Sequence, residues 1–444
     1  MELPDLRNEI ERDCARIVIG GPRRTGTLVR IVGLMLEARG IVASVGECCS
    51  IGMTGGGTVD AEVVGFSDKT TFLMPYGHPT GIGPGAAVVV RGSSFKVKLG
   101  RAMLGRVLDA RCAPLDGKPP PVCADEQGLQ GFPLNPMERG PIHEPLDVGV
   151  KAINGVLTLG KGQRVGLMAG SGVGKSVLLG MITRYTKADV VVIGLIGERG
   201  REVNEFIRET LGPEGLAKSV VIAAPADVSP VLRLRAGNVA HLIAEYFRDQ
   251  GLNVLLLIDS LTRVAHAQRE IGLAVGEPPT MKGYPPSVFA LLPQMIERAG
   301  VGRNGYGSVT AIYTVLMEGD DAADPIVDIA RASLDGQVML SRSLADAAHY
   351  PAIDLSGSIS RIMPSICDRP TLAAANRFRR LWTLFQQNQD LIKVGAYQSG
   401  ANAELDEAIS RRPDMERFLR QEMHEGVELG GAVALLTAAA GHPG

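Results

Sequence analysis

The chain lacks the cysteine spacing, the charge excess and the long apolar runs that mark several classes of protein. Its six cysteines show no CxxC or other metal-ligand spacing, and 444 residues are too many for a disulfide scaffold, so we expect reduced thiols in a cytoplasmic protein. The formal net charge is −2, which indicates neither nucleic acid nor an anionic membrane as a global partner. No run approaches the roughly 18 apolar residues of a membrane helix, and the first residues, MELPDLRNEIERDCARIV, carry acids where a signal peptide is basic. The sequence therefore predicts a soluble protein that could still dock on a membrane complex.

What the chain does have is core-forming material. Hydrophobic residues make up 45% of it, enough for two or three domains. Residues 1 to about 20 fit either a short amphipathic helix or a frayed terminus. From about 24 to 97 come short alternating runs separated by glycine (GTLVRIVG, IVASVGE, AEVVGF, TTFLMP and AAVVVRG). They predict a small antiparallel barrel, and the prolines at 119–121 mark a linker after it.

From about 145 to 365, β-rich runs alternate with helical ones. The predicted strands are RVGLMA, DVVVIGLIG, SVVIAA, NVLLLID, SVTAIYTVL and GQVMLS. Continuous apolar strands imply a sheet covered on both faces, hence a mainly parallel α/β domain. After about 370, AANRFRRLWTLFQQNQDLI and MERFLRQEMHEG have helical periodicity and predict a small helical domain.

A phosphate-binding loop is predicted between the first of these strands and a helix, in AGSGVGKS (169–176). Glycines let successive backbone N–H groups point at phosphate oxygens, and the helix N-terminus adds partial positive charge. Lys175 would reach the β- and γ-phosphates, and the Ser176 hydroxyl would ligate Mg²⁺. Ala169 replaces the first glycine of the usual GxxxxGK[ST] pattern. The residues expected to bind the nucleotide here are Gly170, Ser171, Gly172, Val173, Gly174, Lys175, Ser176 and Val177.

Two acidic residues follow apolar strands. Asp259 ends NVLLLID, at the sheet edge where open α/β proteins bind ligands; beside a phosphate loop it is expected to organise Mg²⁺, whereas alone it would be assigned as a helix cap. Glu198 follows VVVIGLIG, and we expect this strand to lie beside the phosphate-loop strand, which would place Glu198 past the γ-phosphate to polarise the attacking water. Its alternative is a surface ion pair with Arg199 or Arg201.

The motifs AGSGVGKS, GLIGERGREV, LLLIDSLTR, GEPPTMKGYPPSVF and HYPAIDLSGSISR, in this order, resemble the catalytic subunits of rotary ATP synthases. They are still more similar to the ATPases of flagellar and type III protein secretion, and the resemblance runs from about residue 24 to the C-terminus. KSVVIAAPADVSP, GERGREVNEFI, TVLMEGDDAADPI and NQDLIKVGAY resemble the flagellar export ATPases most closely, with the virulence-secretion ATPases as near neighbours.

The resemblance implies a RecA-like P-loop core with a six-stranded N-terminal β-barrel and a C-terminal helical domain. The implied boundaries are 1–22 for an N-terminal helix, 23–97 for the barrel, 98–367 for the ATPase domain with its linker, and 368–444 for the helical domain.

Roles for individual residues also follow from the resemblance. Glu198 matches the general base, Glu202 matches a polar residue of the same site, which we place with the metal, and Arg263 matches an arginine facing the phosphates. Tyr350 matches an aromatic residue that packs on adenine. Arg361, in SGSISR, matches the arginine finger that reaches the nucleotide of the neighbouring subunit, so that hydrolysis requires assembly.

Partners are implied in the same way. A ring of six identical chains is expected because one chain carries phosphate loop, base and finger together, and the stretch VGEPPTMKGYPPSVF would face its channel. The family further implies a peripheral-stalk regulator on the N-terminal helix, a coiled-coil central stalk protein in the pore, chaperone–substrate complexes at the C-terminal domain and a membrane export gate. The protein would be cytoplasmic and peripherally associated with the inner-membrane export apparatus, with ATP and Mg²⁺ as substrate and cofactor.

Three alternatives stay open from the sequence. A virulence type III secretion ATPase would share every catalytic residue. A β-type subunit of a rotary ATP synthase should lack Arg361, since its finger comes from another chain. An RNA-dependent hexameric ATPase should carry basic and aromatic residues interleaved on its barrel; residues 24–97 hold only four scattered aromatics, so no nucleic-acid role is expected. Those four are Phe66, Phe72, Tyr76 and Phe95.

Overall fold

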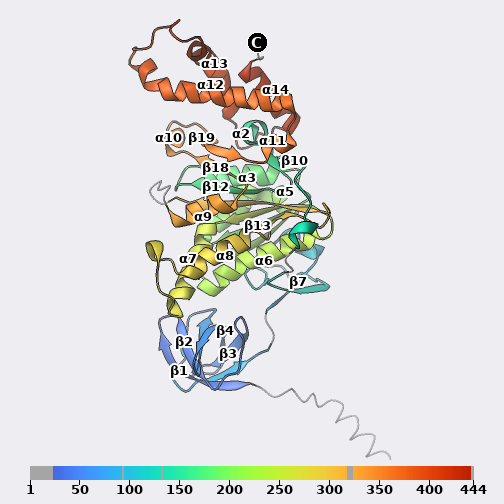
Figure 1. Cartoon of the computed structure of the whole chain (residues 1–444). Helices are drawn as coiled ribbons and strands as arrows, with labels where there is room; N and C mark the ends of the chain where they lie inside the picture. Colours follow the sequence, from blue (N-terminus) through green and yellow to red (C-terminus); the bar gives the residue numbers. More distant parts are fainter. Residues whose placement is uncertain (1–23, 93–94, 132–133, 318–323, 442–444) are drawn as a thin grey trace, which may run out of the picture. The chain divides into compact units, whose positions relative to one another are not determined.

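A computed structural model of the chain describes residues 24–92, 95–131, 134–317 and 324–441 (Figure 1). It divides into two compact units, Met1–Phe95 and Lys96–Gly444. The predicted N-terminal helix over 1–22 lies outside the described residues.

The first unit is a closed barrel of six antiparallel strands in the order β1-β2-β5-β4-β3-β6. Alternate residues point inward and form its core, among them Leu28, Leu36, Ile51 and Leu73, each fully buried. This period-2 pattern is what the sequence shows, and the predicted six-stranded barrel is confirmed. The strands are β1 (Thr25–Val32), β2 (Met35–Arg39), β3 (Cys48–Gly52), β4 (Thr58–Ser67), β5 (Thr70–Pro75) and β6 (Ala87–Val90).

One of the five runs that predicted the barrel is wrong as a strand. IVASVGE, residues 41–47, forms a loop between β2 and β3, with Val42 76% and Val45 60% exposed. Side-chain hydrogen bonds to the loop backbone replace a ladder, because the Glu47 carboxylate accepts the Ser44 N–H at 2.7 Å and Arg24 donates to the Val42 carbonyl at 2.9 Å. An alternating apolar pattern does not distinguish such a loop from a strand.

The second unit is built on a nine-stranded, mostly parallel sheet. Eight strands run in the order β19-β18-β12-β17-β15-β13-β14-β8, and β16 pairs with β17. The central strands are buried along nearly their whole length, which explains their unbroken apolar runs and confirms the α/β class. The strands are β8 (Arg106–Leu108), β12 (Arg164–Ala169), β13 (Val190–Ile196), β14 (Ser219–Ala224), β15 (Asn253–Asp259), β16 (Gly300–Val301), β17 (Ser308–Leu316), β18 (Gly336–Leu340) and β19 (Ile353–Ser360). Two small ribbons accompany it, β7 (Lys96–Leu99) with β9 (Asp125–Gly128) and β10 (Pro145–Leu146) with β11 (Leu159–Gly160).

Helices cover both faces of this sheet, with α6 to α8 grouped on one side and α3 and α5 on the other (Figure 1). The helices of this layer are α3 (Lys175–Tyr185), α4 (Gly200–Glu205), a π-helical segment η3 (Phe206–Leu211), α5 (Gly212–Ala217), α6 (Pro230–Arg248), α7 (Leu261–Ala274), α8 (Pro286–Ile296), α9 (Pro325–Ser333) and α10 (Arg342–Asp346). Short 3₁₀ turns are η1 (Arg101–Met103), η2 (Pro136–Glu138) and η4 (Met281–Gly283). The stretch 275–289 is thus a loop with one 3₁₀ turn, and its last residues already begin α8.

The strand order corrects one expectation. The strand that precedes Glu198, β13, does not lie beside the phosphate-loop strand β12, because β17 and β15 stand between them. Strand order is set by which helical crossovers pack on which face, and local sequence does not encode it.

The C-terminal helices share a core with the nucleotide-binding part of the unit. The helices α12 and α14 pack on α2, and their buried residues Phe378, Trp382 and Leu436 belong to the same apolar cluster as the sheet (Figure 1). The helices of this region are α2 (Lys151–Val156), α11 (Met363–Ile366), α12 (Arg369–Lys393), α13 (Ala403–Leu419) and α14 (Leu429–Ala440). The predicted helical domain is confirmed, although the helix in MERFLRQEMHEG ends at Leu419. Over the described residues, no helix combines the length and apolar character needed to cross a membrane.

Candidate active site

The phosphate loop joins β12 to α3. Gly172 and Gly174 have φ of +77° and +86°, in the left-handed region that glycine adopts at little cost, and Gly174 caps α3 in that conformation. Val173 is buried and anchors the loop, while Ser171 and Ser176 are exposed on the loop surface. Ala169 closes β12 as a strand residue, so the departure from the usual pattern falls where no special backbone is required.

Lys175 bridges the two carboxylates that the sequence singled out. Its Nζ lies 2.5 Å from Asp259 Oδ1 and 3.2 Å from Glu198 Oε1. Burial lowers the pKa of Lys175, but the two carboxylates outweigh this and leave the pKa raised. Lysine, base candidate and metal-ligand candidate therefore meet in one place, as predicted, although two strands separate β12 from β13.

Glu198 stands directly after Gly197, at the end of β13, with its side chain only 16% exposed. Burial raises the pKa of this carboxyl; Lys175 opposes the rise, whereas Asp259 and a hydrogen bond with Glu202 add to it. A raised pKa makes the ionised carboxylate a stronger base, which suits a group that accepts a proton from water.

Arg263 packs against Gly197, the residue that precedes Glu198. It is in the first turn of α7, and a Cβ built on Gly197 (φ +70°) would come within 2.7 Å of the Arg263 side chain, so only glycine fits there. The buried Nε of Arg263 makes no hydrogen bond within the described structure, and Nη1 lies 3.5 Å from His266 Nδ1. A buried guanidinium nitrogen without a hydrogen-bond partner in the described structure, packed against the residue before Glu198, fits a site that binds an anion.

Tyr350 packs against the phosphate loop. A Cβ on Gly174 would be 3.4 Å from its ring, and the ring is 45% exposed. Its backbone carbonyl accepts the Gln421 N–H at 3.0 Å, which ties it to the residues following α13. The Tyr350 ring thus lies beside the phosphate loop and is partly exposed, and its contact with adenine stays a prediction.

The sequence reasoning missed two residues at this site. Arg342, at the start of α10, donates from Nη2 to the Ser171 carbonyl of the phosphate loop at 3.2 Å. Thr314, within β17, donates to Asp259 Oδ1 at 2.6 Å. Neither carries a motif signal, because each reaches the site only through the strand order.

The residues present fit a magnesium ion held together with a nucleotide. Among the described residues no cluster of three or more His, Cys, Asp or Glu side chains could hold a metal by itself. An exposed Ser176 hydroxyl and a buried Asp259 carboxylate are instead the partial oxygen set that phosphate oxygens and waters complete. Glu202, on α4, is 43% exposed and paired with Arg199 at 3.4 Å.

Arg361 lies near the amino end of β12, whereas the phosphate loop lies at its carboxyl end. It follows β19, which runs antiparallel to β18, and Ser360 pairs with Gly336 at the start of β18. The Arg361 N–H donates to the carbonyl of Asp335, whose carboxylate binds the Arg164 N–H at the start of β12, whereas the loop begins at the end of β12. The six residues of β12 span roughly 17–20 Å, and this length separates the neighbourhood of Arg361 from the phosphate loop. The guanidinium is exposed there and donates a hydrogen bond to the Leu334 carbonyl at 3.4 Å.

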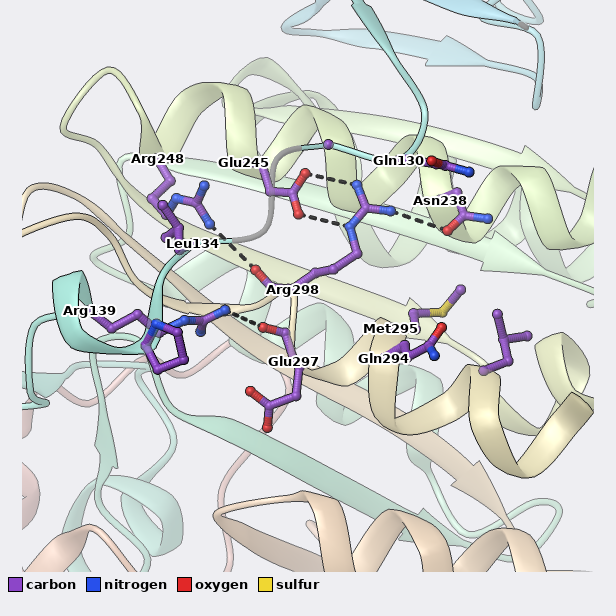
Figure 2. A pocket seen from close by; sticks show the side chains of 13 residues that line it. Gln130, Leu134, Arg139, Asn238, Glu245, Arg248, Gln294, Met295, Glu297 and Arg298 are labelled. Carbon is purple, nitrogen blue, oxygen red and sulfur yellow. Dashed lines mark hydrogen bonds and ion pairs between the residues drawn. The ribbon is translucent and has the colours of Figure 1, made fainter.

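A separate pocket of about 780 Å³ lies between α6 and α8 (Figure 2). Its charges are mutually satisfied: Arg298 forms two 2.8 Å hydrogen bonds to Glu245, and Arg139 donates to the carbonyls of Ala299 and Glu297. None of its lining residues belongs to the phosphate loop. We therefore assign the Glu245–Arg298 ion pair to tying α6 to the segment that follows α8.

A phosphate loop whose lysine meets strand-end acids places the chain among the P-loop nucleotide hydrolases. Comparison with known proteins narrows the class: the chain belongs to the flagellar and type III secretion ATPases, ATP-hydrolysing enzymes of the ATP synthase alpha/beta family. The family models that match are the ATP synthase alpha/beta nucleotide-binding domain (residues 149–360), its beta-barrel domain (28–92) and the T3SS EscN ATPase C-terminal domain (367–438).

Individual relatives agree over nearly the whole chain. The flagellum-specific ATP synthase of Pseudomonas aeruginosa is 56% identical over 416 residues, 93% of this chain and 92% of its own length. The type 3 secretion system ATPase of Xanthomonas euvesicatoria is 46% identical over 438 residues, 98% of each chain. Among solved structures, the assembled ATPase EscN of the enteropathogenic E. coli type III secretion system matches with 40% identity and a TM-score of 0.89, covering 94% of this chain and all of that one. EscN in complex with its central stalk EscO matches with a TM-score of 0.86, 40% identity and the same coverage.

Proposed function

We propose that this chain is the ATPase of a flagellar type III export apparatus, acting as a homohexameric ring that hydrolyses Mg-ATP at its subunit interfaces. The observation that carries the proposal is the place of Arg361. Arg361 is exposed near the amino end of β12, whereas the phosphate loop of the same chain lies at the carboxyl end. The arginine therefore does not reach its own phosphate loop, but it can reach that of a neighbouring chain. The related ATPase EscN was solved in assembled form, which supports assembly of this chain.

The residues of the site divide the work of hydrolysis. Lys175 forms ion pairs with both Glu198 and Asp259. When phosphates draw the ammonium away, Glu198 is released to accept a proton from the attacking water, whose oxygen forms the new bond to the γ-phosphorus as the bond to ADP breaks. Arg263 donates toward the phosphates from below.

Mg²⁺, when bound, would neutralise charge on the phosphates. We propose Ser176 and Asp259 as its protein ligands, with Glu202 beside them. Tyr350 packs on adenine, and the loop from Gly170 to Val177 holds the phosphates.

The remaining assignments are proposals from family resemblance. We place the barrel at 23–97, the ATPase domain at 98–367 and the helical domain at 368–444. A peripheral-stalk regulator, a central stalk protein, chaperone–substrate complexes and an export gate are the proposed partners, at the cytoplasmic face of the inner membrane. EscN in complex with its central stalk EscO is a precedent for one of them.

Assembly has a direct kinetic consequence. If the finger comes from a neighbour, we expect Mg-ATPase activity per chain to rise steeply as protein concentration passes the range in which rings form. Phosphate release measured across a dilution series, with mass measured by light scattering on the same samples, checks this. A rate per chain that stays flat from monomer to ring would overturn the interface assignment.

The virulence-secretion alternative has the support of the match to the EscN C-terminal domain and of 46% identity to the Xanthomonas protein. The flagellar relatives from Pseudomonas aeruginosa and Salmonella typhimurium are more similar, at 56% and 55% identity, and favour the flagellar assignment. We therefore expect deletion of the gene to abolish swimming, and the Glu198→Gln chain not to restore it. A motile deletion strain would refute the flagellar assignment but not the assignment of the chain as an ATPase.

A further inference from the structure

Thr314 occupies a central position that the functional assignments above do not use. It lies in β17, between the phosphate-loop strand β12 and the Asp259 strand β15, opposite Leu167 of β12. Its side chain is 1% exposed, and its hydroxyl has two acceptors, Asp259 Oδ1 at 2.6 Å and the Ile258 carbonyl at 3.3 Å. The shorter distance assigns the single hydroxyl proton to the carboxylate.

Asp259 receives two hydrogen bonds from side chains of the described part of the chain, and both go to the same oxygen. Lys175 Nζ and Thr314 Oγ1 lie 2.5 Å and 2.6 Å from Oδ1. Lys175 is shared with Glu198 and is the group that the phosphates of a nucleotide attract. Once the ammonium turns to the phosphates, the threonine hydroxyl is the side-chain donor that stays with Asp259.

We propose that Thr314 is a positioning residue for magnesium: it fixes the Asp259 carboxylate through Oδ1 and leaves Oδ2 to face the ion or one of its waters. The inference rests on the proposed Mg-ATP site and adds a residue to it. Thr314 is suited to this task because a buried strand allows its side chain little freedom and a β-branched residue has a strongly restricted χ1.

The test compares Thr314→Val, which exchanges the hydroxyl for a methyl group of similar size, with Thr314→Ser, which retains the hydroxyl. In EDTA, we expect both variants and the wild type to bind a fluorescent ADP analogue equally. With magnesium added, Thr314→Val should need about tenfold more Mg²⁺ for half-maximal tightening of binding and for half-maximal kcat, since a hydrogen bond to a charged group is lost. Thr314→Ser should stay within about twofold of the wild type.

Thr310→Val is the matched control. Thr310 lies on the same strand with the same 1% exposure, but its hydroxyl accepts the Gly162 N–H, away from the site. It should lower the melting temperature without moving the Mg²⁺ requirement. Thr314→Ala replaces Thr314→Val if the valine perturbs folding.

A Thr314→Val chain with a wild-type Mg²⁺ requirement, or a Thr310→Val chain that shifts as much, would overturn the inference. Weakened nucleotide binding in EDTA would overturn it too, since it would mark a general structural role. These results differ from a failure of the proposed function, in which the wild-type chain itself shows no Mg²⁺-dependent hydrolysis.

Discussion

Glu198→Gln is expected to lower the ATP turnover rate about 10³-fold while leaving ATP binding close to that of the wild type. The amide has nearly the same size as the carboxylate, so the packing at the end of β13 is retained, but it cannot accept a proton from the attacking water. General-base catalysis contributes about 10²–10⁴-fold to a rate, which sets the size of the loss. Lys175 keeps Asp259 as a partner, so the phosphate loop should hold its shape.

Steady-state phosphate release and titration with a fluorescent ATP analogue measure the two halves of this prediction. Glu205→Gln is the matched control, since Glu205 is the last residue of α4, is 52% exposed and pairs only loosely with Arg201 at 4.0 Å. It should retain the wild-type rate. A Glu198→Gln chain that still hydrolyses ATP at a comparable rate would remove Glu198 as the base and return it to the role of an ion-pair partner for Lys175.

Sequence alone brought Lys175, Glu198 and Asp259 into one hypothesis for a physical reason. Parallel strands end at the same edge of a sheet, so residues that follow β12, β13 and β15 meet there whatever the strand order. The wrong neighbour for β13 therefore did not harm the site prediction. Glycine spacing in the loop was informative for a similarly local cause, because the positive φ of Gly172 and Gly174 restricts the residue type directly.

Residues that reach the site from other strands could not be predicted from local sequence patterns. Thr314 looks like any buried threonine in SVTAIYTVL, and only the insertion of β17 between β12 and β15 brings its hydroxyl to Asp259. Arg342 reaches the Ser171 carbonyl for the same kind of reason, since α10 follows β18, the strand on the other side of β12. Pairing between distant strands is a property of the whole sheet, and no window of sequence contains it.

Mixing two inactive variants should restore hydrolysis. Arg361→Ala alone is expected to lose about 10³-fold or more in turnover, by the measure of other arginine fingers. Glu198→Gln alone is inactive for the reason given above. In a mixed ring, some interfaces combine the intact Glu198 site of an Arg361→Ala chain with the intact Arg361 of a Glu198→Gln chain, and such an interface has every group it needs. For random mixing of equal amounts, about a quarter of interfaces are of this kind, so activity should recover to an appreciable fraction of wild type.

This complementation separates a finger from other roles because it depends on which chain supplies the arginine. The register places Arg361 beside the start of β12 and the phosphate loop at its end, so a chain acting on its own nucleotide would have to move the arginine across the sheet. If Arg361 acted within its own chain, or only stabilised β19 through the Leu334 carbonyl, every chain in the mixture would lack either its own Glu198 or its own Arg361. The mixture would then stay inactive. Arg369→Ala, a change at an exposed arginine that begins α12, should leave hydrolysis unchanged and so shows that removal of a surface charge is not enough. Recovery in the mixture, measured at concentrations where light scattering shows rings, would therefore establish both the donor of the finger and the need for a neighbour.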